Sequence, residues 1–485
     1  MKIPTPRAAR LSGLAVFLLL VAASLTSDAP VVATVDSAGD EAGIAADDPS
    51  IRRAMHAVVG QAVLADAARI HGTDSPQYCA TRGLIATCIH PDTPPERVEE
   101  ILRNLPTWDG DGRYQLGDRW NTTAIDGDAG NTGAPINLTY SFLDDGIMIP
   151  GNNNEPDSPS RLYLVMNSHF GSEAVWKAMF AEMFDDWGKH IGVTYEEVAD
   201  DGAAFPNYPG ELGLRGDVRI GSHPIDGQYG VLAYNYYPDV GDMVLDSSDN
   251  WGAPYNDHVF MRNIIRHEHG HGLGLGHVSP ENCQKLMEPY ICQNFDGPQD
   301  DDLRGAMRNY GDTHEFNNNA AGATDLGTLE GPFALEWPAS LTTSVDFDYY
   351  RFTTTGAAEL DVVLDPVGQR YDLEGVMVNT DEVMDLAFRV LGGENGADML
   401  IQVNDVGLGD DEILVDFPLP APGDYWILVF RAAGTPDVQR YDLALDVTLT
   451  DITNVAREAT PAAELAPTLY PNPFNPRTTL RFHAV

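Results

Sequence analysis

Residues 267–277 read "HEHGHGLGLGH", so four histidines and four glycines occupy eleven positions. The apolar residues of 259–265 precede this stretch at helical spacing, which predicts a helix that continues into it. Four residues of an α-helix overshoot one turn by about 40°, so His267 and His271 project side by side. Two imidazoles on one helix face can share a zinc ion, and Glu268 can point at a water on the same metal. The stretch therefore predicts a helix that carries a metal site.

A third zinc ligand is expected after a sharp turn. Catalytic zinc takes three protein ligands and keeps one position open for water. His277 is the candidate, but six more helical residues would carry it away from the metal. Gly274 permits a left-handed turn without a Cβ clash, and this turn would end the helix and bring His277 back. His269 points off the metal face and receives no role.

The spacing H-E-x-x-H-x-x-G-x-x-H fixes five residues, and a chance match in such a chain is on the order of one in ten thousand. A glycine-rich phosphate loop is the rival interpretation. The glycines match neither the dinucleotide nor the Walker spacing, and no Lys-Ser/Thr pair follows them. We therefore set the phosphate loop aside.

Composition limits the partners. The chain has 485 residues, for which about three domains are expected. Its 29 Lys and Arg against 73 Asp and Glu give a formal net charge of -44, which would repel nucleic acid and anionic membrane surfaces. Neither is expected as a partner.

The first 23 residues have the pattern of a secretory signal peptide. Basic residues precede an apolar run at 11–23 and a polar stretch follows it. The run is too short to span a bilayer comfortably, and a one-helix membrane anchor is the weaker alternative. In an exported protein, the close pairs Cys79 with Cys88 and Cys283 with Cys292 predict two disulfides.

Periodicity divides the rest of the chain. Residues 24–112 carry a helical pattern with the character of a prosegment. Residues 113–312 are predicted to form an α/β or α+β layer domain, with α+β preferred. Its strands are expected at 135–143, 192–198, 216–221, 230–238 and 242–246, and an apolar helix stripe at 175–187 would lie on the sheet. An all-β sandwich is predicted at 313–449, a linker at 450–468 and a closing motif at 469–485.

The motif resembles that of a known family. His267, Glu268, His271, Gly274 and His277, followed by Met287 in "LMEP", resemble the metzincin metalloproteases and their Met-turn. Segments such as "RGDVRIG", "VLAYNYYP" and "DGPQDDDLRGAMRNYG" occur in the order found in bacterial matrixin-like proteins, so the resemblance covers about 113–312.

The resemblance implies a fold and several roles. It implies a five-stranded twisted sheet with an active-site helix and a C-terminal helix. Substrate would lie as an added strand along "VLAYNYY". Met287 would form the hydrophobic base of the site, and Asp301 and Asp302 would anchor the Met-turn and the matured N-terminus. Tyr290 is interpreted as pocket wall.

The resemblance also implies the metal content. One catalytic zinc is expected, because the positions of the family's structural-zinc histidines hold Tyr234 and Val244. Asp226, Asp246 and Asp249 match the family's calcium ligands, and the alternative is that they are solvated loop acids.

The sequence departs from the family at two points. Val278 stands where matrixins usually have Ser, and the Pro-Arg-Cys-Gly switch is missing. Cys79 or Cys88 could cap the zinc in a latent form, although a mutual disulfide is favoured.

Two further resemblances lie near the C-terminus. "EFNNNAAGATDLGTLEG", "VDFDYYRFTTTGAAELDVVL" and "APGDYWILVF" resemble the bacterial pre-peptidase C-terminal domain, a β-sandwich. Contact with a cell surface or polymer is one reading of this domain, and a passive spacer is the other. "LYPNPFNPRTTLRF" resembles the start of a sorting domain of the type IX (Por) secretion system.

Together these features predict a secreted zinc-dependent endopeptidase that acts on proteins or peptides. Glu268 would take a proton from water and later pass it to the leaving amine. A non-catalytic surface-binding or adhesion protein on the same scaffold is the alternative from another class, and a zinc-dependent amidase acting on a non-protein substrate is the third. The loop at 286–298 would shape the primed-side pocket.

Overall fold

The computed structural model describes most of the chain after residue 84 and leaves the predicted signal peptide at 1–23 outside the described residues. Cys79 and the larger part of the predicted prosegment also lie outside them. The described residues are 85–104, 113–152, 155–373, 375–450, 468–471 and 478–481. Among them, no helix is both long enough and apolar enough to cross a bilayer.

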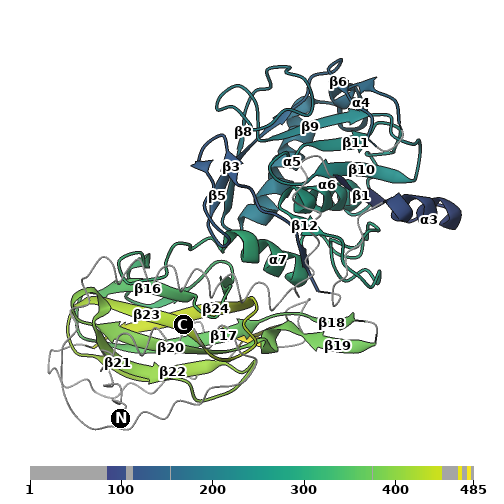
Figure 1. Cartoon of the computed structure of the whole chain (residues 1–485). Coiled ribbons are helices and arrows are strands. Elements are labelled where there is room, and N and C mark those ends of the chain that lie inside the picture. Colours follow the sequence, from purple (N-terminus) through teal and green to yellow (C-terminus); the bar gives the residue numbers. More distant parts are fainter. Residues whose placement is uncertain are drawn as a thin grey trace, which may run out of the picture. The chain divides into compact units, whose positions relative to one another are not determined.

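A six-stranded mixed sheet forms the framework of the first region (Figure 1). The pairing between neighbours is antiparallel for the first three strands and parallel for the rest. In sheet order, the strands are β1 (Ile85–Ile89), β10 (Val231–Tyr236), β11 (Met243–Asp246), β9 (Val218–His223), β5 (Ile136–Phe142) and β8 (Val193–Glu197).

Five of these strands confirm the strands predicted from alternation. The sixth, β1, comes from outside the predicted domain at 113–312, in the segment at 24–112 for which only a helical pattern is predicted. β1 has the sequence IATCI, in which β-branched residues alternate, and it pairs along the edge of β10. The predicted prosegment therefore contains a strand as well as a helix, α3 (Pro95–Asn104).

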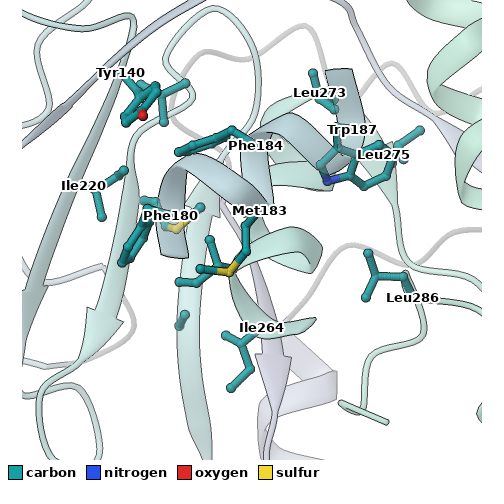
Figure 2. Packing of buried hydrophobic residues seen from close by; sticks show 14 of the residues in the cluster. Tyr140, Phe180, Met183, Phe184, Trp187, Ile220, Ile264, Leu273, Leu275 and Leu286 are labelled. Atoms are coloured by element: carbon teal, nitrogen blue, oxygen red, sulfur yellow. The ribbon is translucent and has the colours of Figure 1, made fainter. Parts of the chain in front are cut away.

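Helices cover the sheet. They are α4 (Leu162–Phe170), α5 (Glu173–Gly188) and α6 (Val259–Gly272); α7 (Asp300–Tyr310) lies instead beside the short strand β12. Phe180, Met183, Phe184 and Trp187 recur along α5 at three- and four-residue spacing and are all buried (Figure 2). Their partners come from the sheet and from α6; the ring centroids of Phe184 and Tyr140 lie 4.5 Å apart. The predicted apolar stripe is confirmed except at Val175, which is exposed, and it packs α5 into the same apolar core as the sheet and α6.

Short strand pairs complete this region. β2 (Gln115–Leu116) pairs with β12 (Leu275–Gly276), directly after the histidine helix. The other pairs are β3 (Thr122–Thr123) with β4 (Gly127–Asp128) and β6 (Met148–Ile149) with β7 (Ser158–Pro159).

The second region is all-β, as predicted for 313–449. One sheet has the order β13 (Thr324–Thr328), β16 (Phe347–Thr354), β23 (Gly423–Gly434), β20 (Met384–Gly392) and β21 (Asp398–Val403). The other has β14 (Pro332–Ala334), β24 (Gln439–Leu449), β17 (Ala358–Val367) and β22 (Glu412–Leu419), with β15 (Ala339–Leu341) also on β24. A single apolar core contains residues of both sheets, as in a sandwich.

Smaller elements accompany the sandwich. They are the hairpin β18 (Arg370–Leu373) and β19 (Val376–Asn379), the 3₁₀ turns η1 (Thr380–Glu382) and η2 (Glu394–Gly396), and the pair β25 (Thr468–Pro471) and β26 (Thr478–Arg481) in the closing motif.

One of the two predicted disulfides is confirmed. Cys283 and Cys292 are bonded, with their Cα atoms 5.5 Å apart. The predicted pair of Cys79 and Cys88 is wrong, because Cys88 is a free cysteine that lies buried on β1. Its place is set by the pairing of β1 with β10, a long-range contact that the spacing of two cysteines cannot reveal.

Candidate active site

Helix α6 presents His267, Glu268 and His271 and ends at Gly272. Gly274 follows with a φ of +90°, the left-handed conformation that the sequence predicts. A Cβ at Gly274 would also lie 2.3 Å from the carbonyl oxygen of Asp118, so a side chain is excluded twice. The chain turns back at this point.

The turn brings the three predicted histidines together. Nε2 of His267 lies 3.0 Å from Nε2 of His271, and Nε2 of His277 lies 3.3 Å and 3.2 Å from these two atoms. A tetrahedral zinc ion about 2.0–2.1 Å from each nitrogen would separate its ligands by roughly 3.3 Å. The three imidazoles therefore fit a zinc ion.

Backbone carbonyls orient the first two rings. Nδ1 of His267 lies 2.7 Å from the carbonyl oxygen of Leu286, and Nδ1 of His271 lies 2.7 Å from that of Leu275. A proton on Nδ1 leaves the lone pair of Nε2 free to bind metal. Burial lowers the pKa of His267 to about 4 and lowers that of His271 and His277 well below the usual value. All three rings are thus held neutral, the form that binds zinc.

Glu268 is completely buried beside the histidines. Its Oε1 accepts a hydrogen bond of 3.1 Å from the backbone N–H of Cys88, and Oε2 has no partner among the described residues. Burial raises the pKa of Glu268 to about 8, while the hydrogen bonds from Cys88 act in the opposite direction. A buried carboxyl whose pKa lies near neutrality is suited to taking and giving a proton.

Met287 lies under the helix, as the resemblance implies. A Cβ on Gly270 would stand only 2.4 Å from Sδ of Met287, so glycine at this position allows the close approach. Asp302 accepts hydrogen bonds from the backbone N–H groups of Leu286 and Met287, at 2.8 and 3.0 Å. Asp301 instead accepts a hydrogen bond of 2.9 Å from the hydroxyl of Tyr371.

The chain's own residues 85–90 run past the histidines along β10. The strands are antiparallel, with Cys88 opposite Ala233. The backbone N–H of Ile89 donates to the carbonyl of Pro289 at 2.9 Å, and its carbonyl accepts from Ile291 at 3.4 Å. The peptide is held between the edge strand and the wall that contains Tyr290, with the N–H of Cys88 on Glu268.

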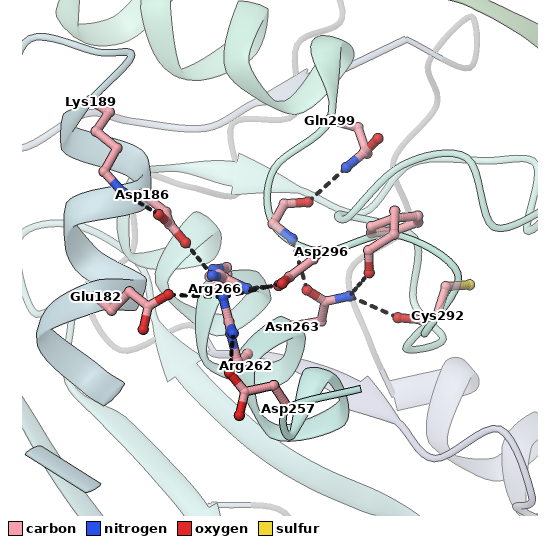
Figure 3. Close-up of polar contacts among 12 residues, drawn as sticks. Glu182, Asp186, Lys189, Asp257, Arg262, Asn263, Arg266, Cys292, Asp296 and Gln299 are labelled. Carbon is pink, nitrogen blue, oxygen red and sulfur yellow. Dashed lines mark hydrogen bonds and ion pairs between the residues drawn. The ribbon is translucent and has the colours of Figure 1, made fainter. Parts of the chain in front are cut away.

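Sequence reasoning missed this segment and the polar contacts behind α6 (Figure 3). Arg266 is buried and pairs with Asp186 of α5 and with Asp296. Asn263 donates 2.9 Å hydrogen bonds from Nδ2 to the carbonyls of Cys292 and Phe295. These contacts tie the helix to the disulfide loop. Polar residues on an otherwise apolar helix face were the available signal.

Of the three predicted calcium ligands, Asp246 ends β11, whereas Asp226 and Asp249 lie in loops beside it. They are not among the groups of described residues whose ligand atoms all lie within 4.8 Å of one another. Burial, together with Asp246 and Asp226, raises the pKa of Asp249 to about 7. Asp246 accepts backbone hydrogen bonds from Asp226 and Gly227, which brings the loops together. Asp226 also forms a 3.0 Å ion pair with Arg97 of α3.

The part of the chain that contains this site matches a known family in sequence. Residues 162–311 match the Matrixin family. At the level of the family, the match supports a metalloprotease, and matrixins typically depend on zinc. The Matrixin region, residues 162–311, contains the three histidines, Glu268 and Met287.

Curated relatives agree with this match over part of their length. Metalloendoproteinase 4-MMP of Arabidopsis thaliana is 28% identical over 162 residues, which cover 31% of this chain and 45% of that protein. Metalloendoproteinase 1-MMP of the same plant is 31% identical over 144 residues, and this match covers 28% of this chain and 38% of that protein. Matrix metalloproteinase-16 of Homo sapiens is 32% identical and covers 26% of this chain and 22% of its own length. The chain thus spans less than half of each relative.

Solved structures give only a weak likeness. The pre-peptidase C-terminal domain of a collagenase from Bacillus anthracis is 14% identical, and the match covers 26% of this chain and 94% of that domain. The TM-score of 0.18 is too low to support an argument.

Proposed function

We propose that this chain is a zinc-dependent endopeptidase in which Glu268 is the general base. The observation that carries the proposal is the convergence of three Nε2 atoms within 3.3 Å of one another, next to a buried glutamate. A zinc ion held by these atoms would polarise the scissile carbonyl and make water more acidic. Hydrolysis of a peptide library, measured with and without a chelator of zinc, tests the proposal.

The chain's own groups supply positioning and proton transfer. Carbonyls of β10 and of the wall at Pro289 hold a peptide as an added strand, which fixes the bond to be cut. Glu268 would take a proton from water and deliver it to the leaving nitrogen. One contact supports the delivery of a proton to the leaving nitrogen. Oε1 of Glu268 already accepts a hydrogen bond from a backbone nitrogen, that of Cys88, in a strand paired with β10.

The proposal also covers export, latency and the role of the β-sandwich. We infer export through the signal peptide at 1–23 and a zymogen in which 24–112 precedes the catalytic domain. The β-sandwich at 313–449 would serve as a spacer or contact a surface. A non-catalytic adhesion protein is the alternative, and it would bind its partner without cutting any peptide in the library.

We expect activation to cut the chain between about Leu105 and Pro135, and within this range the contacts of Trp120 favour a cut before that residue. Trp120 is completely buried and donates a 2.8 Å hydrogen bond to the carbonyl of Gly272. A cut beyond Trp120 would remove this contact from the end of the histidine helix. N-terminal sequencing of active enzyme is the measurement, and an active form that begins near Ser24 would refute the zymogen.

We expect one zinc ion per chain and a calcium ion at Asp226, Asp246 and Asp249. Tyr234 and Val244 stand at the positions for a structural zinc, and both pack in an apolar cluster. Metal analysis of the purified protein should therefore find one zinc, and two tightly held zinc ions would overturn this count. Asp249→Asn should bind one calcium fewer than wild type at unchanged zinc. Equal calcium counts would mean that these acids hold no calcium ion.

A further inference from the structure

The first turn of α7 contacts both the catalytic region and the β-sandwich region, and the two regions belong to one compact unit. Asp300 forms a 2.7 Å ion pair with Arg440 of β24. Asp301 accepts a 2.9 Å hydrogen bond on Oδ1 from the hydroxyl of Tyr371, which lies on β18. Asp302, in contrast, accepts hydrogen bonds from the backbone of the catalytic region. Three consecutive acids thus join both regions through one helix turn.

The strand β18 also contacts the loop that leads from the third histidine to the Met-turn. The side-chain amide of Asn282 donates a 2.9 Å hydrogen bond to the carbonyl of Asp372. The backbone N–H of Asp372 in turn donates a 2.8 Å hydrogen bond to Oε1 of Gln284. The ammonium group of Lys285 lies 5.0 Å from the centre of the Tyr371 ring. A strand of the sandwich region therefore holds the loop that precedes the Met-turn.

A buried ion pair fixes the same interface. Arg304 of α7 and Asp437, which lies between β23 and β24, are each 1% exposed, and their charged groups are 3.0 Å apart. Removing one partner of such a pair is strongly destabilising, because the other charge stays buried without compensation. Tyr371 is also 1% exposed, so its contact with α7 is shielded from water. Directed bonds in a dry interface thus hold the two regions together.

Hydrogen bonds connect this interface to His267, a proposed zinc ligand. Asp302 follows Asp301 in the same turn and accepts a 2.8 Å hydrogen bond from the N–H of Leu286. The carbonyl of Leu286 is the group that lies 2.7 Å from Nδ1 of His267. These four residues are each 2% exposed or less. A shift of the first turn of α7 would therefore move the carbonyl that orients the His267 ring.

We propose that Tyr371 is a positioning residue for the histidine site. Its hydroxyl fixes the first turn of α7, and this turn holds Leu286 so that His267 presents Nε2 to the metal. The β-sandwich region is then part of the working metal site rather than a spacer. The role of Tyr371 in hydrolysis rests on the proposed peptidase function, whereas its role in metal binding does not.

The test compares wild type with Tyr371→Phe in the full chain. Phenylalanine keeps the buried ring but removes the hydroxyl that bonds Asp301. The Kd for zinc, measured by competition with a chromogenic chelator, should rise by about three- to tenfold, less than the roughly 10–100-fold typical of a group bonded directly to a zinc ligand. The kcat for peptide hydrolysis should fall by a similar factor. KM should stay near the wild-type value, because the described contacts of Tyr371 are with α7 and the loop before the Met-turn, whereas substrate would lie along β10.

Two further variants make the outcome decisive. Tyr349→Phe is the matched control, because it removes a half-buried hydroxyl from β16 of the same region and should keep the zinc Kd of wild type. Asn282→Ala changes an exposed residue and removes one contact between the loop and β18. It should raise the zinc Kd in the same direction as Y371F, so the test survives if Y371F does not fold.

Zinc binding separates a positioning role from a merely structural one. A structural contact would lower the Tm alone, so zinc Kd values of Y371F and N282A equal to that of wild type would overturn the proposal even if the Tm falls. Weaker zinc binding by these variants in a protein that cuts no peptide would support the positioning role and remove only the proposed peptidase function.

Discussion

Glu268→Gln is expected to keep the zinc content of the protein and to lower kcat for peptide hydrolysis by about 10²–10⁴-fold. Glutamine has nearly the same shape and leaves His267, His271 and His277 in place, but it cannot carry a proton. The loss of kcat should be large because Glu268 is fully buried. Among the described residues, no other carboxylate accepts the N–H of Cys88 and could replace Glu268 at that position. The measurement is cleavage of a fluorogenic peptide by activated protein, with metal analysis of the same samples.

Glu281→Gln is the matched control. Glu281 is exposed in the loop between His277 and Met287, so this variant should cut peptides at the wild-type rate. Cleavage by E268Q close to that rate, at full zinc occupancy, would show that another group takes the proton.

The centre of the site could be predicted because its residues are close in sequence. Helix periodicity places His267 and His271 on one face, and a left-handed glycine is the simplest way to bring His277 back. The structure confirms this, with a φ of +90° at Gly274. The five strands of the catalytic domain and the disulfide of Cys283 with Cys292 also follow from local patterns.

Long-range pairing could not be read in the same way. β1 lies about 140 residues before β10 in the chain, so nothing in its neighbourhood indicates which edge it joins. The short spacing of Cys79 and Cys88 therefore predicts a local disulfide, whereas the pairing of β1 with β10 buries Cys88 as a free cysteine beside Glu268. Local alternation in "IATCI" could have indicated a strand, but its partner becomes visible only in the fold. Sites built from one helix and its turn are predictable from spacing, whereas sites built across strands are not.

Ile89→Pro is expected to raise the activity of the uncut protein on added peptides by about tenfold or more. This expectation rests on the proposed peptidase function. It also rests on the proposal that the strand at 85–90 takes the place of a substrate on β10 and so blocks the site. Proline lacks the N–H that Ile89 donates to Pro289 at 2.9 Å, and its ring is poorly tolerated in a paired strand. A loss of about 1.4 kcal/mol in strand binding corresponds to this tenfold change. Initial rates on protein shown by mass spectrometry to be intact provide the measurement.

Cys88→Ser tests whether the strand at 85–90 or the thiol of Cys88 keeps the uncut protein inactive. Serine keeps the backbone N–H that bonds Glu268 and the register opposite Ala233, so the uncut variant should stay as inactive as wild type. If the thiol itself blocked the metal, C88S would instead become active while I89P stayed latent. A synthetic peptide of residues 83–92 should also compete with substrate on the cut enzyme, because it can form the same strand on β10. An I89P protein no faster than wild type, together with no inhibition by this peptide, would rule out the strand.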